Sequence, residues 1–185
     1  MEIIIARHGR PQPDDHTPIA RAGFRGWVTG SEQAPLDPTL LPSPALSALA
    51  ASAGCVVTST LRRSVESAAL LAPGRVVISE PVFAEAGMPI STPDDRAIRP
   101  RHWNALGRVA WVLGWSRGRE SWPAARHRAS QAGARLDELA RAHGSVLLVG
   151  HGLLNLLIQR ALRAAGWSGG GWRADYWSHV ILRNK

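Results

Sequence analysis

Residues 2–9 read Glu-Ile-Ile-Ile-Ala-Arg-His-Gly, a short apolar run that ends in the tripeptide Arg7-His8-Gly9. Far along the chain, the apolar run 146–149 ends in the same way and is followed by His151-Gly152 after one glycine. Short apolar runs of this length are typical of buried strands. Ligands of open α/β sheets bind at the carboxyl ends of the strands. We therefore expect the two histidines to meet in one site, and imidazoles in such a place suit phosphate chemistry.

The residues between these two runs alternate between strand and helix patterns. Ser43-Pro44 is typical of a helix start, because serine caps the helix and proline fits its first position. Strands are expected at 2–6, 55–58, 75–79, 145–149 and 177–182, and helices at 18–30, 44–53, 60–71, 101–113, 122–143 and 153–164. This order predicts one three-layer α/β/α domain over residues 1–185, with a mostly parallel central sheet and the last strand at its edge.

The segment 81–100 interrupts the alternation with four prolines. Long irregular segments in compact domains often serve function. We expect this one, about residues 81–100, to shape a substrate pocket.

The composition restricts the classes of function. The chain has 185 residues and a formal net charge of +8 at pH 7, with one lysine, Lys185. This charge suits anionic partners, although a general preference for arginine explains it more simply. Basic blocks interleaved with aromatic residues are missing, so no nucleic-acid partner is expected. Cys55, the single cysteine, excludes an internal disulfide and a cysteine-based metal cluster, and we expect it to be buried in a strand.

Two further expectations concern location. The apolar stretches are too short to span a membrane, so no membrane partner is expected. The chain opens directly into a strand pattern without a basic leader, which indicates a cytoplasmic protein.

Four motifs, in order and across almost the whole chain, carry a resemblance to the histidine phosphatase superfamily, the phosphoglycerate mutase-like proteins. The first is Ile3–Gly9 and the second is Thr58-Ser59-Thr60-Leu61-Arg62-Arg63-Ser64-Val65-Glu66-Ser67-Ala68. The third is Phe83-Ala84-Glu85 and the fourth is Leu147–Gly152. The resemblance implies a phosphoglycerate mutase-like fold.

The resemblance also implies a phosphate pocket with a histidine nucleophile, His8. An imidazole attacks phosphorus only if one ring nitrogen is unprotonated and aimed, so the other needs a hydrogen-bond partner. The transferred phosphoryl group spreads charge over three oxygens, which fixed donors stabilise. The resemblance assigns this phosphate binding to Arg7, Gly9, Arg63 and His151, and His151 also counts as catalytic. Glu85 would protonate the leaving oxygen and then activate water. Neither step needs a metal or another cofactor.

Other readings of these residues stay open. Arg62 and Arg63 point to different faces of a helix, so only one enters the pocket; the family spacing favours Arg63 and leaves Arg62 to pair with Glu66. Another acid of the 81–100 segment is the alternative to Glu85. Three residues near the motifs are candidates for substrate contact, each with a structural alternative: Arg10, His16 and Asn155.

The tryptophan-rich stretch 103–115 is unusually apolar. Trp111 and Trp115 are four residues apart and share a helical face. Core packing is the expected role, and a homodimer surface or a lid over the site is the alternative.

The function expected from these residues is that of a metal-independent phosphomonoesterase that acts on a small phosphorylated metabolite through a phosphohistidine on His8. A phosphoglycerate mutase-like phosphotransferase and a catalytically idle phosphate-binding module are the alternatives. The family's better-known branches carry different residues where this chain has Arg10-Pro11 and after Glu85. The resemblance therefore identifies the chemistry and leaves the substrate open.

Overall fold

The computed structural model describes residues 1–12, 17–87, 97, 99–116, 118–171, 173 and 175–184. Within them, one sheet has the strand order β3-β2-β4-β1-β6-β5. The strands are β1 (Glu2–Arg7), β2 (Cys55–Thr58), β3 (Val77–Ser79), β4 (Ser145–Gly150), β5 (Ser168–Gly169) and β6 (His179–Arg183). The helices are α1 (Arg21–Gln33), α2 (Pro44–Ser52), α3 (Arg62–Leu71), α4 (Pro100–Val112), α5 (Trp122–His143) and α6 (Gly152–Ala164), with a short 3-10 helix η1 (Pro81–Phe83).

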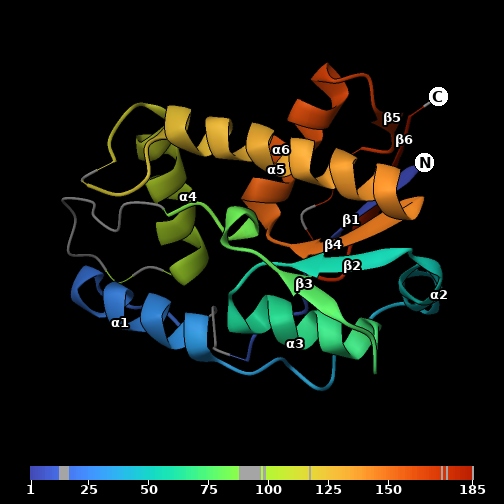
Figure 1. Cartoon of the computed structure of the whole chain (residues 1–185). Helices are drawn as coiled ribbons and strands as arrows, with labels where there is room; N and C mark the ends of the chain where they lie inside the picture. Colours follow the sequence, from blue (N-terminus) through green and yellow to red (C-terminus); the bar gives the residue numbers. More distant parts are fainter. Residues whose placement is uncertain are drawn as a thin grey trace.

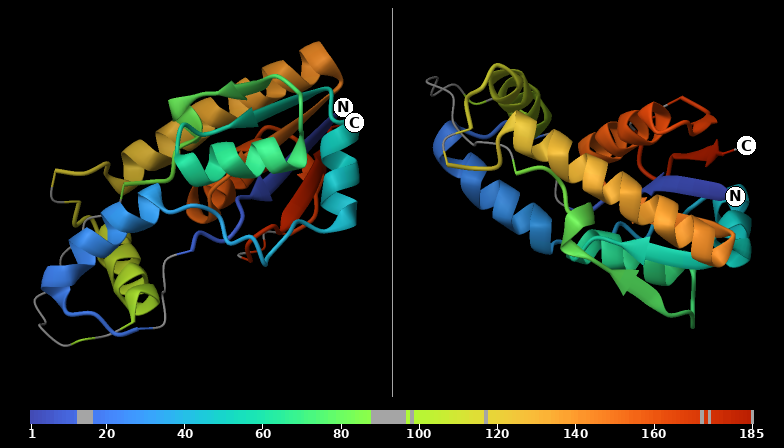
Figure 2. Two further views of the ribbon diagram at one scale, coloured as in Figure 1. Left: turned by 90° about the horizontal axis from the view of Figure 1, so that it is seen from below. Right: turned by 45° about the horizontal axis from the view of Figure 1, so that its top comes forward.

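Helices cover both faces of this sheet, as Figures 1 and 2 show. The central strand β1 explains why: Ile3 and Ile5 pack into a cluster with α5 and α6. Ile4 and Ala6 point the other way, into a cluster with α2 and α3. Alternate side chains of a strand face opposite sides of a sheet, so an unbroken apolar run needs a helical layer on each side. The predicted three-layer α/β/α fold is confirmed.

The register between β1 and β4 places the two histidine motifs side by side. These strands are parallel neighbours, with Ile4 opposite Leu147 and Arg7 opposite Gly150. The pairing continues one residue further, because the His8 N–H donates to the Gly150 carbonyl over 3.0 Å. His8 and His151 therefore leave the same edge of the sheet from adjacent strands.

The helix boundaries follow the local sequence signals. The Ser43 hydroxyl accepts a hydrogen bond from the Leu46 N–H, as expected for an N-cap followed by proline. α5 spans the predicted residues 122–143 and ends at Gly144, whose φ of 79° favours glycine. α1 begins three residues later than expected, at Arg21. Cys55 lies buried in β2, as predicted.

The expectation that the last strand forms the sheet edge is wrong. β6 lies between β1 and β5 and runs antiparallel to both. The edge strand on this side is β5, which has only two residues, Ser168 and Gly169. A two-residue strand beside a run of glycines has no hydrophobic periodicity, so sequence patterns give no sign of it.

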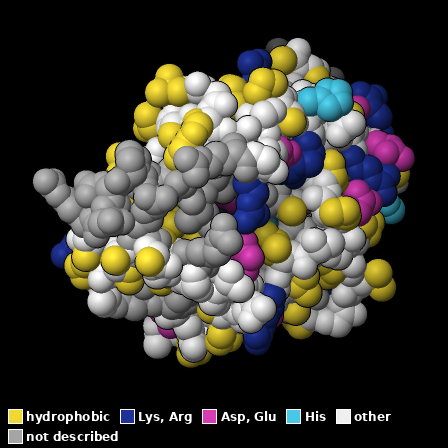
Figure 3. Space-filling model, turned by 90° about the vertical axis from the view of Figure 1, so that its left-hand side faces the viewer, with side chains coloured by type: hydrophobic (Ala, Val, Ile, Leu, Met, Phe, Trp, Pro, Cys, Tyr) yellow, Lys and Arg dark blue, Asp and Glu magenta, His cyan; other side chains and the backbone are white. Residues whose placement is uncertain are grey.

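The tryptophan-rich helix α4 combines core and surface. Trp103 and Trp111 are buried, which confirms core packing for these two side chains. The opposite stripe of the helix and the residue after it are exposed, at Leu106, Val109, Val112 and Leu113. Hydrophobic side chains reach the surface on the side of the molecule that carries α1 and α4 (Figure 3). The helix thus has two apolar faces and buries only one of them in the chain. Half of the segment 81–100, namely 88–96 and 98, lies outside the described residues.

Candidate active site

Two buried imidazoles form the centre of the candidate site. The ring centroids of His8 and His151 lie 5.0 Å apart, with the planes inclined by 57°. Both side chains are almost inaccessible to solvent. They occupy the carboxyl ends of β1 and β4, where the sheet order places them next to each other. A group bound between them would contact both rings.

A backbone carbonyl fixes the tautomer of His8. Its Nδ1 lies 2.7 Å from the Gly9 carbonyl oxygen, and a carbonyl can only accept, so Nδ1 carries the hydrogen. The Nε2 atom is then the one with a free lone pair. Burial, and after it the charges of Arg63 and Arg7, lower the pKa of His8 well below its ordinary value of 6.5. At neutral pH the side chain is therefore an uncharged imidazole, the form that acts as a nucleophile.

Gly9 is held so closely that a larger residue would not fit. A β-carbon there would lie 2.4 Å from the Trp177 ring. The Gly9 N–H donates to the Ser67 hydroxyl over 2.9 Å, and that hydroxyl donates to the Arg63 carbonyl over 2.6 Å. Ser67 thereby connects the end of β1 to the first turns of α3.

Two guanidinium groups provide the positive charge of the site. Arg7 comes from β1 and its Cζ lies 4.0 Å above the centroid of the Tyr176 ring. Arg63 comes from the first turn of α3. The charges of both guanidinium groups lower the pKa of His8 and of His151. Burial is also the main cause that lowers the pKa of each arginine.

His151 is oriented by hydrogen bonds at its ring and at its backbone. Its Nε2 lies 2.7 Å from the Ser59 hydroxyl, and among the described residues its buried Nδ1 has no hydrogen-bond partner. Burial is the main cause that lowers the pKa of this histidine, followed by the charges of nearby groups. Asn155 accepts from the His151 N–H over 3.2 Å and donates to the Ala6 carbonyl over 3.0 Å. Asn155 therefore joins the ends of β1 and β4 from within α6, and both ends of its amide are engaged with the backbone.

Glu85 reaches the site from the segment after η1. Its carboxylate accepts from the Leu154 N–H over 3.0 Å and from the Leu153 N–H over 3.4 Å. These amides belong to the first turn of α6, directly after His151, and a carboxylate is favourable at a helix N-terminus. The charge of Glu85 also acts on Arg7 and on Arg63. The acid predicted from sequence thus lies at the same end of the sheet as the histidines.

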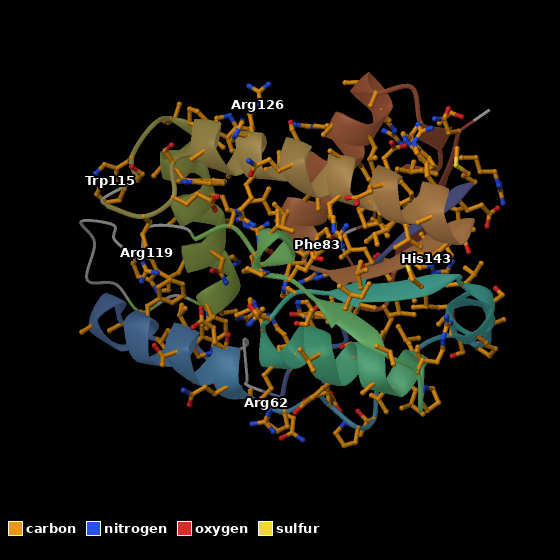
Figure 4. All side chains as sticks on the ribbon, in the orientation of Figure 1. Arg62, Phe83, Trp115, Arg119, Arg126 and His143 are labelled. Carbon is orange, nitrogen blue, oxygen red and sulfur yellow. The ribbon has the colours of Figure 1, made fainter. Side chains whose placement is uncertain are left out.

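The remaining candidate residues from the sequence are Arg10, His16 and Arg62. The Arg10 guanidinium forms an ion pair of 2.6 Å with Asp37, and hydrogen bonds from Thr39 and Arg10 lower the pKa of Asp37 to about 2. His16 lies outside the described residues. The predicted pair of Arg62 with Glu66 is confirmed at 2.6 Å, on the outer side of α3. Figure 4 shows Arg62 there, away from the sheet.

Sequence reasoning missed Ser67 and Tyr176 as parts of the site. Ser67 follows Arg63 by four residues, so helical spacing places the two on one face and would have indicated it. Tyr176 contacts both Arg7 and His8, with its ring centroid 5.7 Å from that of His8. It belongs to an irregular stretch before β6 in which no periodicity marks it. Its one signal is that it is the single tyrosine of the chain.

Two features are absent from the described residues. None of the helices there combines the length and the hydropathy that crossing a bilayer requires. No group of three histidine, cysteine or acidic side chains in the same part of the chain is arranged to hold a metal ion.

Comparisons with known proteins bear on the family and the fold of the chain. The model of the histidine phosphatase superfamily (branch 1) matches residues 3–183. The structure of an α-ribazole-5′-P phosphatase, described as putative, from Escherichia coli is similar at 23% identity and a TM-score of 0.60, covering 98% of this chain and 89% of that one. A mycobacterial glucosyl-3-phosphoglycerate phosphatase is similar at 18% identity and a TM-score of 0.58, with 97% and 88% covered.

A phosphoglycerate mutase from Bacillus anthracis is similar to the same degree, at 18% identity and a TM-score of 0.58, with 98% and 87% covered. At these identities the similarity concerns the fold. A search of curated proteins found no match. The family model covers nearly the whole chain, and on that ground the chain belongs to the histidine phosphatase superfamily, branch 1.

Proposed function

We propose that this protein is a metal-independent phosphomonoesterase that works through a phosphohistidine on His8. The observation that carries the proposal is the state of the His8 ring. Its Nδ1 donates to the Gly9 carbonyl, its pKa is lowered by burial and by the charges of Arg63 and Arg7, and its ring lies next to a second imidazole. This arrangement is suited to in-line attack on a bound phosphate.

In the first step, the Nε2 lone pair of His8 attacks phosphorus and the bond from phosphorus to the ester oxygen breaks. Negative charge stays on the three phosphoryl oxygens, and Arg7 and Arg63 are placed to stabilise it. The buried Nδ1 of His151 is available to a bound phosphate as a further contact. The leaving oxygen takes a proton from the Glu85 carboxyl.

In the second step, water attacks the phosphohistidine while Glu85 takes its proton. The bond between phosphorus and Nε2 breaks, inorganic phosphate forms, and His8 returns to its neutral state. The hydrogen bond from Nδ1 to Gly9 persists throughout, so the same ring nitrogen is aimed at phosphorus in each turnover.

Hydrolysis is favoured over transfer between two hydroxyls of one metabolite. A mutase must keep the phosphoenzyme away from water, and this chain of 185 residues offers little material for a cap beyond the segment 81–100. The similarity to both phosphatases and a mutase leaves this choice to experiment.

The test is to incubate the protein with an aryl phosphate in the presence of a chelator and to measure phosphate release and phosphoenzyme. We expect the wild type to release phosphate and to form a phosphoenzyme that is stable in alkali and lost in acid, as phosphohistidines are. His8→Ala should lose both. His143→Ala is the matched control, because His143 is exposed at the end of α5 (Figure 4).

Full activity of His8→Ala would contradict the assignment of the nucleophile. Phosphate that remains bound without turnover in the wild type would instead identify a binding module. Arg63→Ala should slow release by roughly a hundredfold to a thousandfold, the usual cost of removing one donor to developing charge.

A further inference from the structure

A partly buried ion pair lies behind the segment that carries Glu85, and the motifs of the family do not include it. The Arg128 guanidinium on α5 and the Glu120 carboxylate form two parallel hydrogen bonds, both of 2.7 Å. The two side chains are only about one-fifth exposed, at 20% and 21%. Planar bidentate pairs of this kind hold their geometry more firmly than single contacts.

The Arg128 side of this pair fixes the backbone before Glu85. Its Nη1 donates to the Ala84 carbonyl over 2.6 Å and to the Val82 carbonyl over 2.9 Å. Phe83, between these two carbonyls, is fully buried beneath α5 (Figure 4). The backbone that leads to Glu85 is therefore held in one position.

The Glu120 side of the pair faces the backbone after Glu85. Its hydrogen bonds with Arg128 are the main cause that lowers the pKa of Glu120, and the nearby Gly87 backbone N–H contributes to a smaller extent. The Glu120 carbonyl accepts from the Trp111 indole over 2.6 Å, and Trp111 is fully buried against the edge of Trp122. One ion pair, anchored to the hydrophobic core, thus holds the segment just before Glu85 and lies near its backbone just after Glu85.

We propose that Arg128 and Glu120 are positioning residues that aim the Glu85 carboxyl at the leaving oxygen; this inference rests on the function proposed above. The Glu85 side chain is the part of the segment that points towards α6 and the histidines. Because hydrogen bonds from Arg128 hold the backbone at Val82 and Ala84, the Glu85 carboxyl is kept at that place. A misplacement of about 1 Å can cost a hundredfold in rate, so such support matters.

Arg128→Lys tests the proposal, because lysine keeps the charge but cannot span two carbonyls and a carboxylate at once. Arg141→Lys is the matched control: Arg141 forms a similar double hydrogen bond with Asp137 on the same helix, on an exposed side. Glu120→Gln is a second variant that removes the charge and keeps the size.

The measurement is the burst rate of phosphoenzyme formation with two substrates, phenyl phosphate and 2,4-dinitrophenyl phosphate. The first leaving group needs a proton and the second does not. Glu85→Gln should slow the burst with phenyl phosphate by about a hundredfold or more and leave the dinitrophenyl burst nearly unchanged. Arg128→Lys and Glu120→Gln should show the same selective loss, by about tenfold.

Hydrogen exchange at the Leu153 and Leu154 amides gives an independent readout. Both amides donate to Glu85, so the exchange should accelerate in Arg128→Lys and stay at the wild-type rate in Arg141→Lys.

Equal slowing with both substrates, or a behaviour of Arg128→Lys like that of Arg141→Lys, would overturn the positioning role and leave the proposed function intact. A wild type that forms no phosphohistidine would overturn the proposed function, and the positioning role with it.

Discussion

His8 and His151 are buried as neutral imidazoles, and this makes the stability of the folded protein depend on pH. Both pKa values are lowered in the folded state, from an ordinary value of 6.5. Below that pH the unfolded chain takes up protons that the folded state does not bind, so stability falls as the pH falls and is fully present above it. The slope is at most about 1.4 kcal/mol per pH unit for each histidine.

Urea unfolding between pH 8 and pH 5 checks this expectation. His151→Asn should flatten the decline, because one buried titrating group is gone. The same change at the exposed His143 should leave the decline as it is. An unaltered slope in His151→Asn would show that the ring is protonated in the folded state.

Gly9 is a second position where a single substitution should strongly affect the stability of the fold. Gly9→Ala would drive a β-carbon to 2.4 Å from Trp177, whose indole is tied to the Leu40 carbonyl over 2.7 Å. Overpacking of this kind costs about 1–3 kcal/mol, which thermal unfolding would detect. Gly26→Ala is the control, since within the described part of the chain no atom outside its own stretch of helix lies within 4 Å of a β-carbon there, and it should stabilise helix α1 instead.

At the scale of elements, the N-terminus of α6 is capped by a residue from a distant part of the chain. Its own first turn has no acidic residue and its cap residue His151 makes no side-chain capping bond. Glu85 accepts from two amides of that turn instead. Glu85→Ala should therefore lower the free energy of unfolding by about 1 kcal/mol, a typical cost of losing a cap.

Glu85→Gln should lower the free energy of unfolding less than Glu85→Ala does, because the amide oxygen still accepts a hydrogen bond from the first turn of α6. Equal stability of Glu85→Ala and the wild type would show that the helix needs no such cap. Both variants are to be compared by chemical denaturation at neutral pH.

Elements with strong local signals were predictable from sequence, and those defined by long-range pairing were not. The strand of Ile3–Ile5 and the helix 122–143 have clear periodicity and clear ends, so their existence and bounds follow from the chain itself. β5 has no pattern, and the position of β6 depends on which strand it pairs with. In the site, the resemblance led to His8, Arg63, Glu85 and His151, which the fold brings together. The contacts of Tyr176 and of the Arg128–Glu120 pair depend on packing between distant segments.

At the scale of the whole molecule, the site concentrates positive charge in a chain that already carries +8. Inorganic phosphate or vanadate should therefore stabilise the folded protein without any turnover. Stabilisation through binding reaches about 2.7 kcal/mol when the ligand is at a hundred times its dissociation constant. Thermal unfolding at increasing phosphate concentration measures it.

Two adjacent arginines provide a paired test of this stabilisation. Arg63→Ala should abolish the effect of phosphate, and Arg62→Ala should retain it, because Arg62 points outward and pairs with Glu66. The reverse result would show that the choice between them was wrong.

The parallel pairing of β1 with β4 also determines when the centre of the sheet can form during synthesis of the chain. β1 is made early, but its partner β4 emerges only after most of the chain, and β6 on its other side follows later still. Until then the edges of Ile3–Ile5 are open and apolar, a condition that invites aggregation. The nascent chain therefore contains His8 long before it contains His151, and the two rings can meet only after the chain through β4 has been made.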